Sequence, residues 1–247
     1  MKWFLVISCC LSFHLLAQTP LRVVTEQSPP HQTLINGVVA GLSTELVQAT
    51  LAEAGLHTAI EIYPWARALH IAQNQPNVLI YNIARTKERE NQFHWIGEVA
   101  AYQLGFVKLS HRDEVSIASL SDATKYTVAV QRNDLAADFL QQNNFKAGTQ
   151  LIMVADIAES WRLLLKGNVD LIVDDPVALI DMAVSLNLPE KYVSFVYAIP
   201  ELKQHTWLAA SLNTSADLVS QLQLAHTKVA QSERYREIMS SSYHKVQ

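Results

Sequence analysis

Two arginines and a threonine follow directly on a largely apolar run in residues 78–95, VLIYNIARTKERENQFHW. The run itself, residues 78–83, is typical of a buried strand, and Arg85, Thr86 and Arg89 come after its end. A guanidinium group stays charged at every relevant pH and can meet a carboxylate with two parallel hydrogen bonds. The stretch therefore predicts an anion site at the end of a strand. The alternative is that Arg89 is a solvated residue on a short helical turn.

An acidic residue stands in the corresponding place after another strand candidate. Asp175 follows residues 170–174, DLIVD, and precedes Pro176. Asp followed by Pro is typical of a helix start, because the carboxylate caps free N–H groups and proline fits the first turn. An N-cap aspartate at the carboxyl end of a strand could also bind an ammonium group, and Asp174 beside it could point the same way.

A tryptophan and an arginine lie at the start of a helix candidate at residues 66–74. Trp65 is either an aromatic wall, whose π-face favours ammonium groups, or a core residue that covers the strand candidate at 58–63. Arg67 is either a second anion contact or a surface residue, and Arg85 has the same two interpretations. Arg85 together with Arg89 would make a cationic site, which suits an acidic or dicarboxylic ligand.

The first residues are typical of a cleaved signal peptide. Lys2 is followed by an apolar run at 3–16 and by the small residue Ala17, and the run is too short to span a bilayer comfortably. We therefore expect residues 1–17 to be removed on export to the periplasm; the alternative is an N-terminal anchor helix. Both cysteines, Cys9 and Cys10, lie in this segment, so the mature chain has no disulfide, no thiol nucleophile and no cysteine-based zinc site.

Composition and missing motifs narrow the function further. The formal net charge of −4 and the lack of a long basic block argue against nucleic acid as a partner. No segment after Gln18 is apolar for long enough to cross a membrane. The sequence has neither the G-x-S-x-G nor the H-E-x-x-H motif of hydrolases, and no phosphate-binding G-x-G-x-x-G or Walker loop. We expect no cofactor and no metal site.

Strand and helix candidates alternate along the chain, which argues for an α/β fold with a parallel or mixed sheet covered by helices. Thr44 and Gly55 are expected to cap and to close one helix, and Asp156 with Glu159 forms a capping box at another. Strands are expected at residues 21–26, 58–63, 78–83, 126–130, 150–154, 170–174 and 193–199. Helices are expected at residues 41–55, 66–74, 134–143, 156–167 and 175–186, with one or two more from about residue 215 and a loop at 28–37.

Two small strand-and-helix sets indicate two lobes, with seams near residues 101–110 and 194–204. If the chain returns to the first lobe at the second seam, two strands connect the lobes, and a cleft between them can close on a ligand. Open α/β sheets generally bind ligands at the carboxyl ends of their strands, where Arg89 is expected. About 230 residues after the signal peptide suffice for one large domain or two small ones.

The order of these motifs resembles that of the family 3 extracellular solute-binding proteins, the amino-acid-binding class associated with ABC transporters. The matching elements are an early PP turn, GLSTEL, YPWARAL, ARTKERENQFHWIG, VAVQRND and GNVDLIVDDP, and they span essentially the whole mature chain. The resemblance implies a two-lobed type II periplasmic-binding-protein fold with a two-strand hinge. Residues 18–106 and 200–247 would form one lobe, and residues 107–199 the other.

The resemblance also implies a ligand site. In the family, the arginine that matches Arg89 holds the α-carboxylate of the ligand, and the acidic residue that matches Asp175 pairs with the α-amino group. Trp65 matches the aromatic residue on which family ligands pack. The most specific element is the T-x-x-R segment from Thr86 to Arg89, followed by an aromatic residue at Trp95.

Further contacts are implied less directly. Thr86 and the backbone near Asn82 and Ala84 would add hydrogen-bond donors, and Glu26 is a loose equivalent of an early acidic contact. Family members often have a glycine-rich turn whose N–H groups meet the carboxylate. Here the turn at residues 131–135 begins with Gln131 and contains no glycine, which is a departure from the family pattern.

The function that the resemblance implies is capture of a small polar solute, an amino acid or a related carboxylate, for a membrane permease. Such a protein is expected to be a periplasmic monomer and not an enzyme. One alternative is a periplasmic enzyme on the same fold, similar to the cyclohexadienyl dehydratases, which would need a general acid. Glu26, His31 and Asp174 are candidates for that acid, without a diagnostic spacing. The other alternative is a sensory binder without its own permease.

Overall fold

The computed structural model describes residues 20–189 and 191–244. The expected signal peptide, residues 1–17, lies outside the described residues, and so do both cysteines. None of the helices in the described part of the chain is long and apolar enough to cross a membrane.

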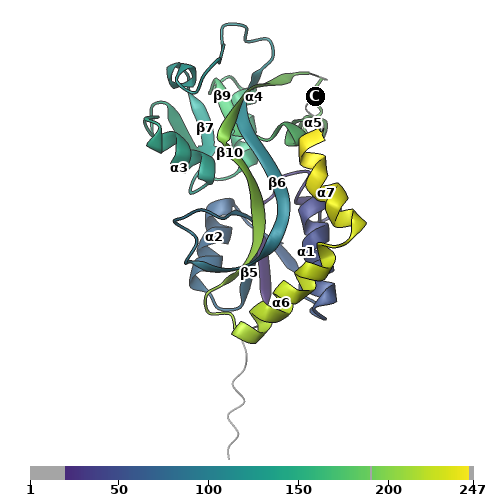
Figure 1. Cartoon of the computed structure of the whole chain (residues 1–247). Helices are drawn as coiled ribbons and strands as arrows, with labels where there is room; N and C mark the ends of the chain where they lie inside the picture. Colours follow the sequence, from purple (N-terminus) through teal and green to yellow (C-terminus); the bar gives the residue numbers. More distant parts are fainter. Residues whose placement is uncertain (1–19, 190, 245–247) are drawn as a thin grey trace, which may run out of the picture.

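A single eight-stranded mixed sheet runs through the molecule in the order β4-β1-β5-β10-β6-β9-β7-β8. Two of its strands, β6 (Phe93–Leu109) and β10 (Val193–Ser211), are much longer than the others and pass from one end of the molecule to the other (Figure 1). The remaining strands of the sheet gather in two groups, each with its own helices. The molecule therefore has two lobes joined by two long strands.

The first lobe contains three parallel strands, with β1 between β4 and β5. Parallel strands need crossover connections, and here helices provide them. Its elements are β1 (Arg22–Thr25), β4 (Ile60–Ile62), β5 (Val78–Ala84), α1 (Leu42–Glu53) and α2 (Trp65–Asn74). Val23 and Leu79 of the sheet and Leu46 and Val47 of α1 are fully buried or nearly so, which makes this helix face and this sheet face one core.

The second lobe repeats the arrangement on a smaller scale. β7 lies between β8 and β9 and is parallel to both. Its elements are β7 (Val128–Gln131), β8 (Leu151–Val154), β9 (Leu171–Asp174), α3 (Leu135–Gln142), α4 (Ile157–Leu165) and α5 (Pro176–Ser185), with a short 3-10 turn η1 (Asp122–Lys125). Trp161, Leu140 and Leu164 are fully buried between these helices and the sheet.

The long strands β6 and β10 form the connection that the sequence left open. They pair antiparallel along nearly their whole length, from Phe93 opposite Ser211 to Leu109 opposite Val193. β10 also pairs with β5 of the first lobe, and β6 pairs with β9 of the second. The chain does return to the first lobe along β10, so the expected two-lobed fold with a two-strand hinge is confirmed. The expected lobe limits, 18–106, 107–199 and 200–247, stay a prediction.

One glycine allows the hinge strands to approach closely. A Cβ atom on Gly105 of β6 would lie 2.3 Å from the carbonyl oxygen of Tyr197 and 2.4 Å from the ring of Phe195, both on β10. Contacts that short do not occur, so any side chain at this position would push the strands apart. The pairing shifts register next to this point, between Ala198 and Lys203 of β10.

The expected loop at residues 28–37 contains a strand. A short hairpin is present, β2 (Thr33–Ile35) and β3 (Val38–Ala40), paired antiparallel. Asn36 and Gly37 form its two-residue turn, with φ angles of 52° and 79°. Two adjacent residues with positive φ are what a type I′ hairpin turn requires, and Asn-Gly is the preferred pair for it. The Asn-Gly pair between two apolar pairs of residues is thus the local signal for this hairpin.

Helix ends follow the expected signals with one exception. Asp156 caps α4 by accepting a hydrogen bond from the N–H of Glu159 at 2.8 Å, and Gly55 takes the left-handed conformation that closes α1. The expectation that Thr44 caps α1 is wrong, because the N-cap is Gly41, without a side-chain hydrogen bond. The Thr44 hydroxyl is buried and lies 2.8 Å from the hydroxyl of Tyr81 instead.

Two C-terminal helices pack on the first lobe, as the sequence predicted. They are α6 (Ala216–Val229) and α7 (Glu233–His244). Both contact α1 and the long strand β6 (Figure 1). Leu222 and Ile238 belong to the same buried core as Leu46. The end of the chain therefore completes the lobe that the beginning of the chain starts.

Candidate functional site

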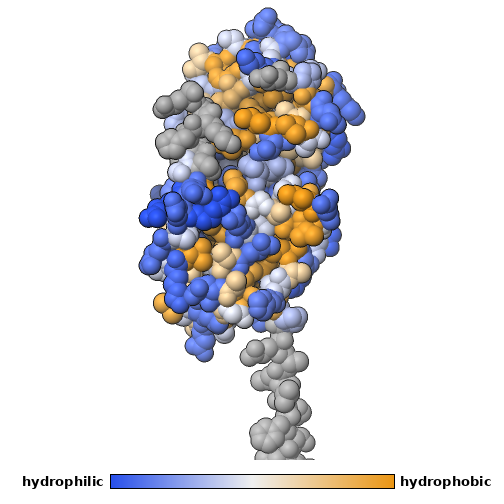
Figure 2. All heavy atoms as spheres, turned by 90° about the vertical axis from the view of Figure 1, so that its right-hand side faces the viewer, coloured by the Kyte–Doolittle hydropathy of each residue, from blue (hydrophilic) through white to orange (hydrophobic). Residues whose placement is uncertain are grey.

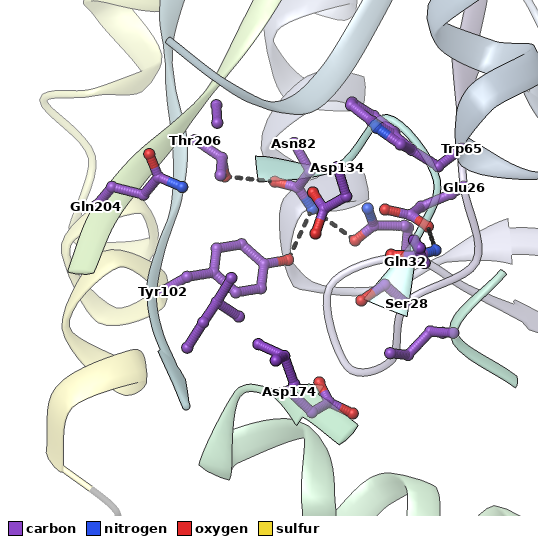
Figure 3. Close-up of a pocket in the computed structure, with 15 residues that line it drawn as sticks. Glu26, Ser28, Gln32, Trp65, Asn82, Tyr102, Asp134, Asp174, Gln204 and Thr206 are labelled. Carbon is purple, nitrogen blue, oxygen red and sulfur yellow. Dashed lines mark hydrogen bonds between the residues drawn. The ribbon is translucent and has the colours of Figure 1, made fainter. Parts of the chain in front are cut away.

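A cavity of about 70 Å³ lies between the two lobes, beside the hinge strands (Figure 3). The lobes touch across it, because Trp65 and Arg89 of the first lobe both donate to the carbonyl oxygen of Asn133 in the second. Drug-sized ligands occupy sites of roughly 300–1,000 Å³, so the cavity suits a small solute. Fifteen residues line the cavity. They are Glu26, Ser28, Gln32, Trp65, Asn82, Ala84, Tyr102, Leu104, Gln131, Asp134, Ile157, Val173, Asp174, Gln204 and Thr206.

The topology of the sheet explains why these residues meet. Parallel strands of both lobes end at the cavity, so that β1, β5, β7 and β9 each supply residues at or just after their carboxyl ends. This is the usual place for a ligand in an open α/β sheet. The hinge strands supply the back wall. Tyr102 and Leu104 are two residues apart on β6, and Gln204 and Thr206 are two apart on β10, which puts each pair on one face of its strand.

Asn82 links the first lobe to both hinge strands. Its side-chain N–H groups donate to the side-chain oxygen of Gln32 and to the hydroxyl of Tyr102, and its side-chain oxygen accepts from the hydroxyl of Thr206 at 3.0 Å (Figure 3). Its φ is 59°, an uncommon conformation for a residue within a strand. Backbone of this kind persists where the surroundings enforce it, and it is concentrated at functional sites.

Three carboxylates line the cavity. Glu26 follows β1 and accepts a hydrogen bond from the side-chain amide of Gln131 in the other lobe. Asp134 is the N-cap of α3, where it accepts from the N–H of Ala136. Asp174 ends β9 and accepts from the indole N–H of Trp161 at 2.7 Å. Each carboxylate is thus held in place by at least one donor of the protein itself.

Burial makes two of these carboxyl groups weak acids. Desolvation, together with the nearby Asp134 charge, raises the pKa of Glu26 to about 8. Desolvation raises the pKa of Asp174 to about 7, although the bond from Trp161 favours its charged form. Burial also raises the pKa of Asp134, against the opposing charge of Arg89. Near neutral pH the ligand-free cavity therefore holds protons that a positive charge could displace.

No positively charged side chain balances these acids from within the cavity wall. Among the residues that the structure describes, no lysine, arginine or histidine lines the cavity. In the same part of the chain, no three His, Asp or Glu side chains are grouped to hold a metal ion.

Arg89 lies beside the cavity and bridges the lobes. It is 7% exposed, and its guanidinium donates to the carbonyl oxygen of Asn133 at 2.9 Å and more weakly to that of Ala84. The indole N–H of Trp65 donates to the same Asn133 oxygen at 3.0 Å. The Arg89 guanidinium carbon is 5.8 Å from the centre of the Trp65 ring. Within the described residues, no ion pair includes Arg89.

Five of the ten residues predicted from the sequence line the cavity: Glu26, Trp65, Asn82, Ala84 and Gln131. Two more do not line it: Arg89 contacts the lining residues Ala84 and Trp65, and the Thr86 carbonyl and hydroxyl both accept from the backbone N–H of Arg89. Asp175 is buried, and its two oxygens accept from the backbone N–H groups of Gln103 and Val177 at 2.8 Å. It therefore acts as a helix cap and ties α5 to the hinge strand β6, and it is not one of the residues that line the cavity.

The other two predicted residues are held elsewhere. Arg85 forms an exposed ion pair with Glu90 at 2.6 Å, and Arg67 stacks over the ring of Tyr63 at 4.5 Å. Neither lines the cavity. The expectation of a cationic site for an acidic or dicarboxylic ligand is therefore wrong, because the charges that line the cavity are acidic.

Sequence reasoning missed Tyr102, Leu104, Gln204 and Thr206, although it had identified their segments as seams between the lobes. Their spacing of two residues was a usable signal for one shared strand face, but which face looks into the cleft depends on the antiparallel pairing of β6 with β10. The sequence around Asp134 predicts a helix start, which the structure confirms, but no local signal places its carboxylate in the cavity.

Comparison with known protein families gives one match. The family described as bacterial extracellular solute-binding proteins, family 3, matches residues 21–244, which is nearly all of the described chain. A comparison with curated proteins finds no match.

Solved structures with the same fold include amino-acid-binding proteins and a sensor domain. An ancestral arginine-binding protein bound to arginine has a TM-score of 0.76 and 20% identity, over 90% of this chain and 97% of that one. The arginine-, lysine-, histidine-binding protein ArtJ from Geobacillus stearothermophilus has a TM-score of 0.76 and 18% identity, over 92% and 96%. A histidine kinase sensor domain with similarity to periplasmic binding proteins has a TM-score of 0.76 and 17% identity, over 91% and 96%. Identities this low show the fold alone.

Proposed function

The chain belongs to the bacterial extracellular solute-binding proteins, family 3, and from this premise we propose that it captures a small polar solute, an amino acid or a related carboxylate, between its lobes. The observation that carries the proposal is the interlobe cavity. Polar side chains from both lobes and from both hinge strands line it. A ligand that touches all of these elements stabilises the closed form over the open one, because the open form cannot make all the contacts at once.

Arg89 is the proposed contact for the ligand's carboxylate. It is buried and charged, and the oxygens that it contacts are backbone carbonyls. A carboxylate that replaced one of these carbonyls would gain a charge-assisted bidentate pair at little cost in ordering, since the side chain is already held in place. Thr86 supports this role by accepting from the N–H of Arg89.

The protein is proposed to do no chemistry on its ligand. It would be exported to the periplasm by its signal peptide, act as a monomer and deliver the solute to an ABC-type permease.

Both lobes carry exposed apolar side chains outside the cavity, including Ile35 and Val38 on the β2–β3 hairpin and Ile180 and Val184 on α5. Hydrophobic areas are visible on both lobes (Figure 2).

An enzyme on the same fold is the second candidate, and one observation favours it. Glu26 lines the cavity with a pKa of about 8, so it is protonated at neutral pH as a general acid must be. His31 is unsuited to that role, because burial lowers its pKa to about 4 and it does not line the cavity. Among the described residues, no cationic side chain lines the cavity to balance the charges of a cyclic dicarboxylic substrate. A sensory role has support from the fold shared with a histidine kinase sensor domain.

The test is a thermal-shift screen of residues 18–247 against amino acids, dicarboxylates, polyamines, small sugars and prephenate-like acids. A ligand at a hundredfold excess over its dissociation constant should add about 2.7 kcal/mol of stability. Arg89→Ala should lose the shift for an amino acid, because truncating one partner of a buried charge pair costs about 2–5 kcal/mol.

Arg85→Ala is the matched control, since Arg85 is also an arginine after β5 but pairs with Glu90 on the surface. It should keep the full shift. A shift that survives Arg89→Ala would remove Arg89 from the site. No shift with any amino acid would contradict the proposed function, and turnover of the cyclic acids would then support the enzyme.

A further inference from the structure

The cavity has a one-sided charge that its proposed function does not require. Its lining side chains include three carboxylates, Glu26, Asp134 and Asp174, while its amides and hydroxyls are neutral. Figure 3 shows Glu26 and Asp174 on opposite sides of the cavity, one from each lobe. A cationic ligand between them meets a carboxyl group from each lobe and favours the ionised form of both.

The carboxylates are spread over three elements and are held apart by separate partners. Gln131 fixes Glu26, the first turn of α3 fixes Asp134, and Trp161 fixes Asp174. They therefore form three acceptor sites around a small volume, each with its own structural bond, although the charges of Asp134 and Asp174 disfavour the ionisation of Glu26. The indole of Trp65 adds an aromatic wall on the side of the first lobe, and aromatic faces attract ammonium and guanidinium groups.

We propose that the cleft is selective for cationic solutes that carry ammonium or guanidinium groups, with Glu26, Asp134 and Asp174 as their acceptors. The proposal rests on the proposed function and names the class of its ligand. Charge complementarity carries it: a solute with positive groups gains an ionised acceptor from each lobe, whereas an anion gains no such partner from any of the three. A neutral amino acid would leave these buried acceptors unmatched.

Two chemical classes share these cationic groups, and Arg89 distinguishes them. A basic amino acid has a carboxylate that Arg89 can bind, and its remaining groups are positive. A diamine or polyamine has no carboxylate, and the Arg89 guanidinium then only repels it. The ligand class can therefore be read from the effect of one variant on two related molecules.

The experiment is isothermal titration of residues 18–247 with matched pairs of ligands. Arginine is compared with its neutral isostere citrulline, ornithine with the diamine putrescine, and glutamate serves as the anion. We expect arginine to bind at least tenfold more tightly than citrulline, and glutamate not to bind. Arg89→Ala should strongly weaken the binding of ornithine, while the affinity for putrescine should stay the same or increase.

Two variants test the acceptors without removing their structural bonds. Glu26→Gln keeps an oxygen for the Gln131 amide, and Asp134→Asn keeps a good N-cap for α3. Each variant should lower the affinity for arginine at least tenfold and reduce the ratio of the affinities for arginine and citrulline. Glu201→Gln, an exposed acid of β10 outside the cavity lining, makes the same charge change as a control and should have no effect.

The outcomes separate this proposal from the function on which it rests. If citrulline or glutamate binds as tightly as arginine, the protein is a solute binder and the charge proposal is wrong. If cations bind tightly but both acceptor variants bind them as wild type does, the acceptors are wrongly assigned and the proposal fails. If none of these solutes binds and the wider thermal-shift screen also finds no ligand, both the charge proposal and the proposed function are wrong.

Discussion

At the scale of single residues, Glu26 and Asp174 tie ligand binding to proton release. Their pKa values are about 8 and about 7 in the ligand-free protein, mainly because burial penalises the charged carboxylate. A cation between them favours the ionised forms and lowers both pKa values. Protons and a cationic ligand therefore compete for the same groups, so affinity should rise as the pH rises from about 6 to 8, by up to about tenfold per pH unit for each proton released.

The groups around these carboxylates set the direction of this effect. Glu26 faces the negative charges of Asp134, Asp174 and Asp156, and Asp174 faces Asp175. These negative charges disfavour the ionisation of Glu26 and Asp174, and a bound cation would offset them. Titration at pH 6, 7 and 8 in two buffers of different ionisation enthalpy measures both the affinity and the protons released. Glu26→Gln should flatten the pH profile; an affinity for cations that is constant or grows on acidification would contradict the prediction.

At the scale of elements, Asn82 holds three segments in register. It bonds to Gln32 in the loop before the hairpin, to Tyr102 of β6 and to Thr206 of β10, from a backbone with φ of 59°. Asn82→Ala loses all three bonds and leaves alanine in a conformation that it tolerates poorly. We expect a loss of roughly 2–4 kcal/mol of stability, measured by urea unfolding.

Asn187 offers a control for the cost of placing alanine in a left-handed backbone conformation. It has φ of 51°, follows α5 and is exposed. Asn187→Ala removes the same residue type from the same conformation, away from the hinge, and should cost roughly 1 kcal/mol. If Asn82→Ala costs no more than this control, its bonds to the hinge strands contribute nothing to stability.

The elements also show what the sequence could predict and what it could not. Strands and helices with strong local signals were predicted, as at α4, where Asp156 caps the first turn and apolar residues repeat at helical spacing. The prediction for Thr44 was wrong because a hydroxyl near a helix start can either cap the helix or pack in the core, and here it is buried against Tyr81.

The prediction for Arg85 was wrong for a related reason. A guanidinium group pairs with whichever carboxylate is nearer, and Glu90 is only five residues away. Tyr102 and Thr206 needed the pairing of two strands about a hundred residues apart, which no local pattern contains.

At the scale of the whole molecule, the closed form is held by contacts that do not involve a ligand. The carbonyl oxygen of Asn133 in the second lobe accepts from Trp65 and Arg89 of the first, and Glu26 accepts from Gln131 across the same cleft. A few hydrogen bonds, each worth about 1 kcal/mol net, are comparable to the free-energy difference between open and closed forms of a hinged protein. Direct lobe-to-lobe bonds therefore set how much of the ligand's binding energy must be used for closure.

Trp65→Phe tests this directly, because it removes one interlobe donor and keeps an aromatic wall. The lost bond to Asn133 should shift the ligand-free protein towards open forms by about 1 kcal/mol, which is roughly a fivefold change in the ratio of closed to open. Trp95→Phe is the matched control, since its indole N–H donates at the same 3.0 Å distance to a carbonyl oxygen, that of Glu90, within the first lobe.

The chain has no cysteine after residue 10, so Lys87→Cys and Lys146→Cys, one exposed site in each lobe, can carry a pair of distance labels without interference. A longer label-to-label distance in Trp65→Phe than in Trp95→Phe, abolished by saturating ligand, is the expected result. Equal distances in the two variants would mean that the Asn133 bond does not hold the lobes together, and that closure depends on packing at the hinge strands instead.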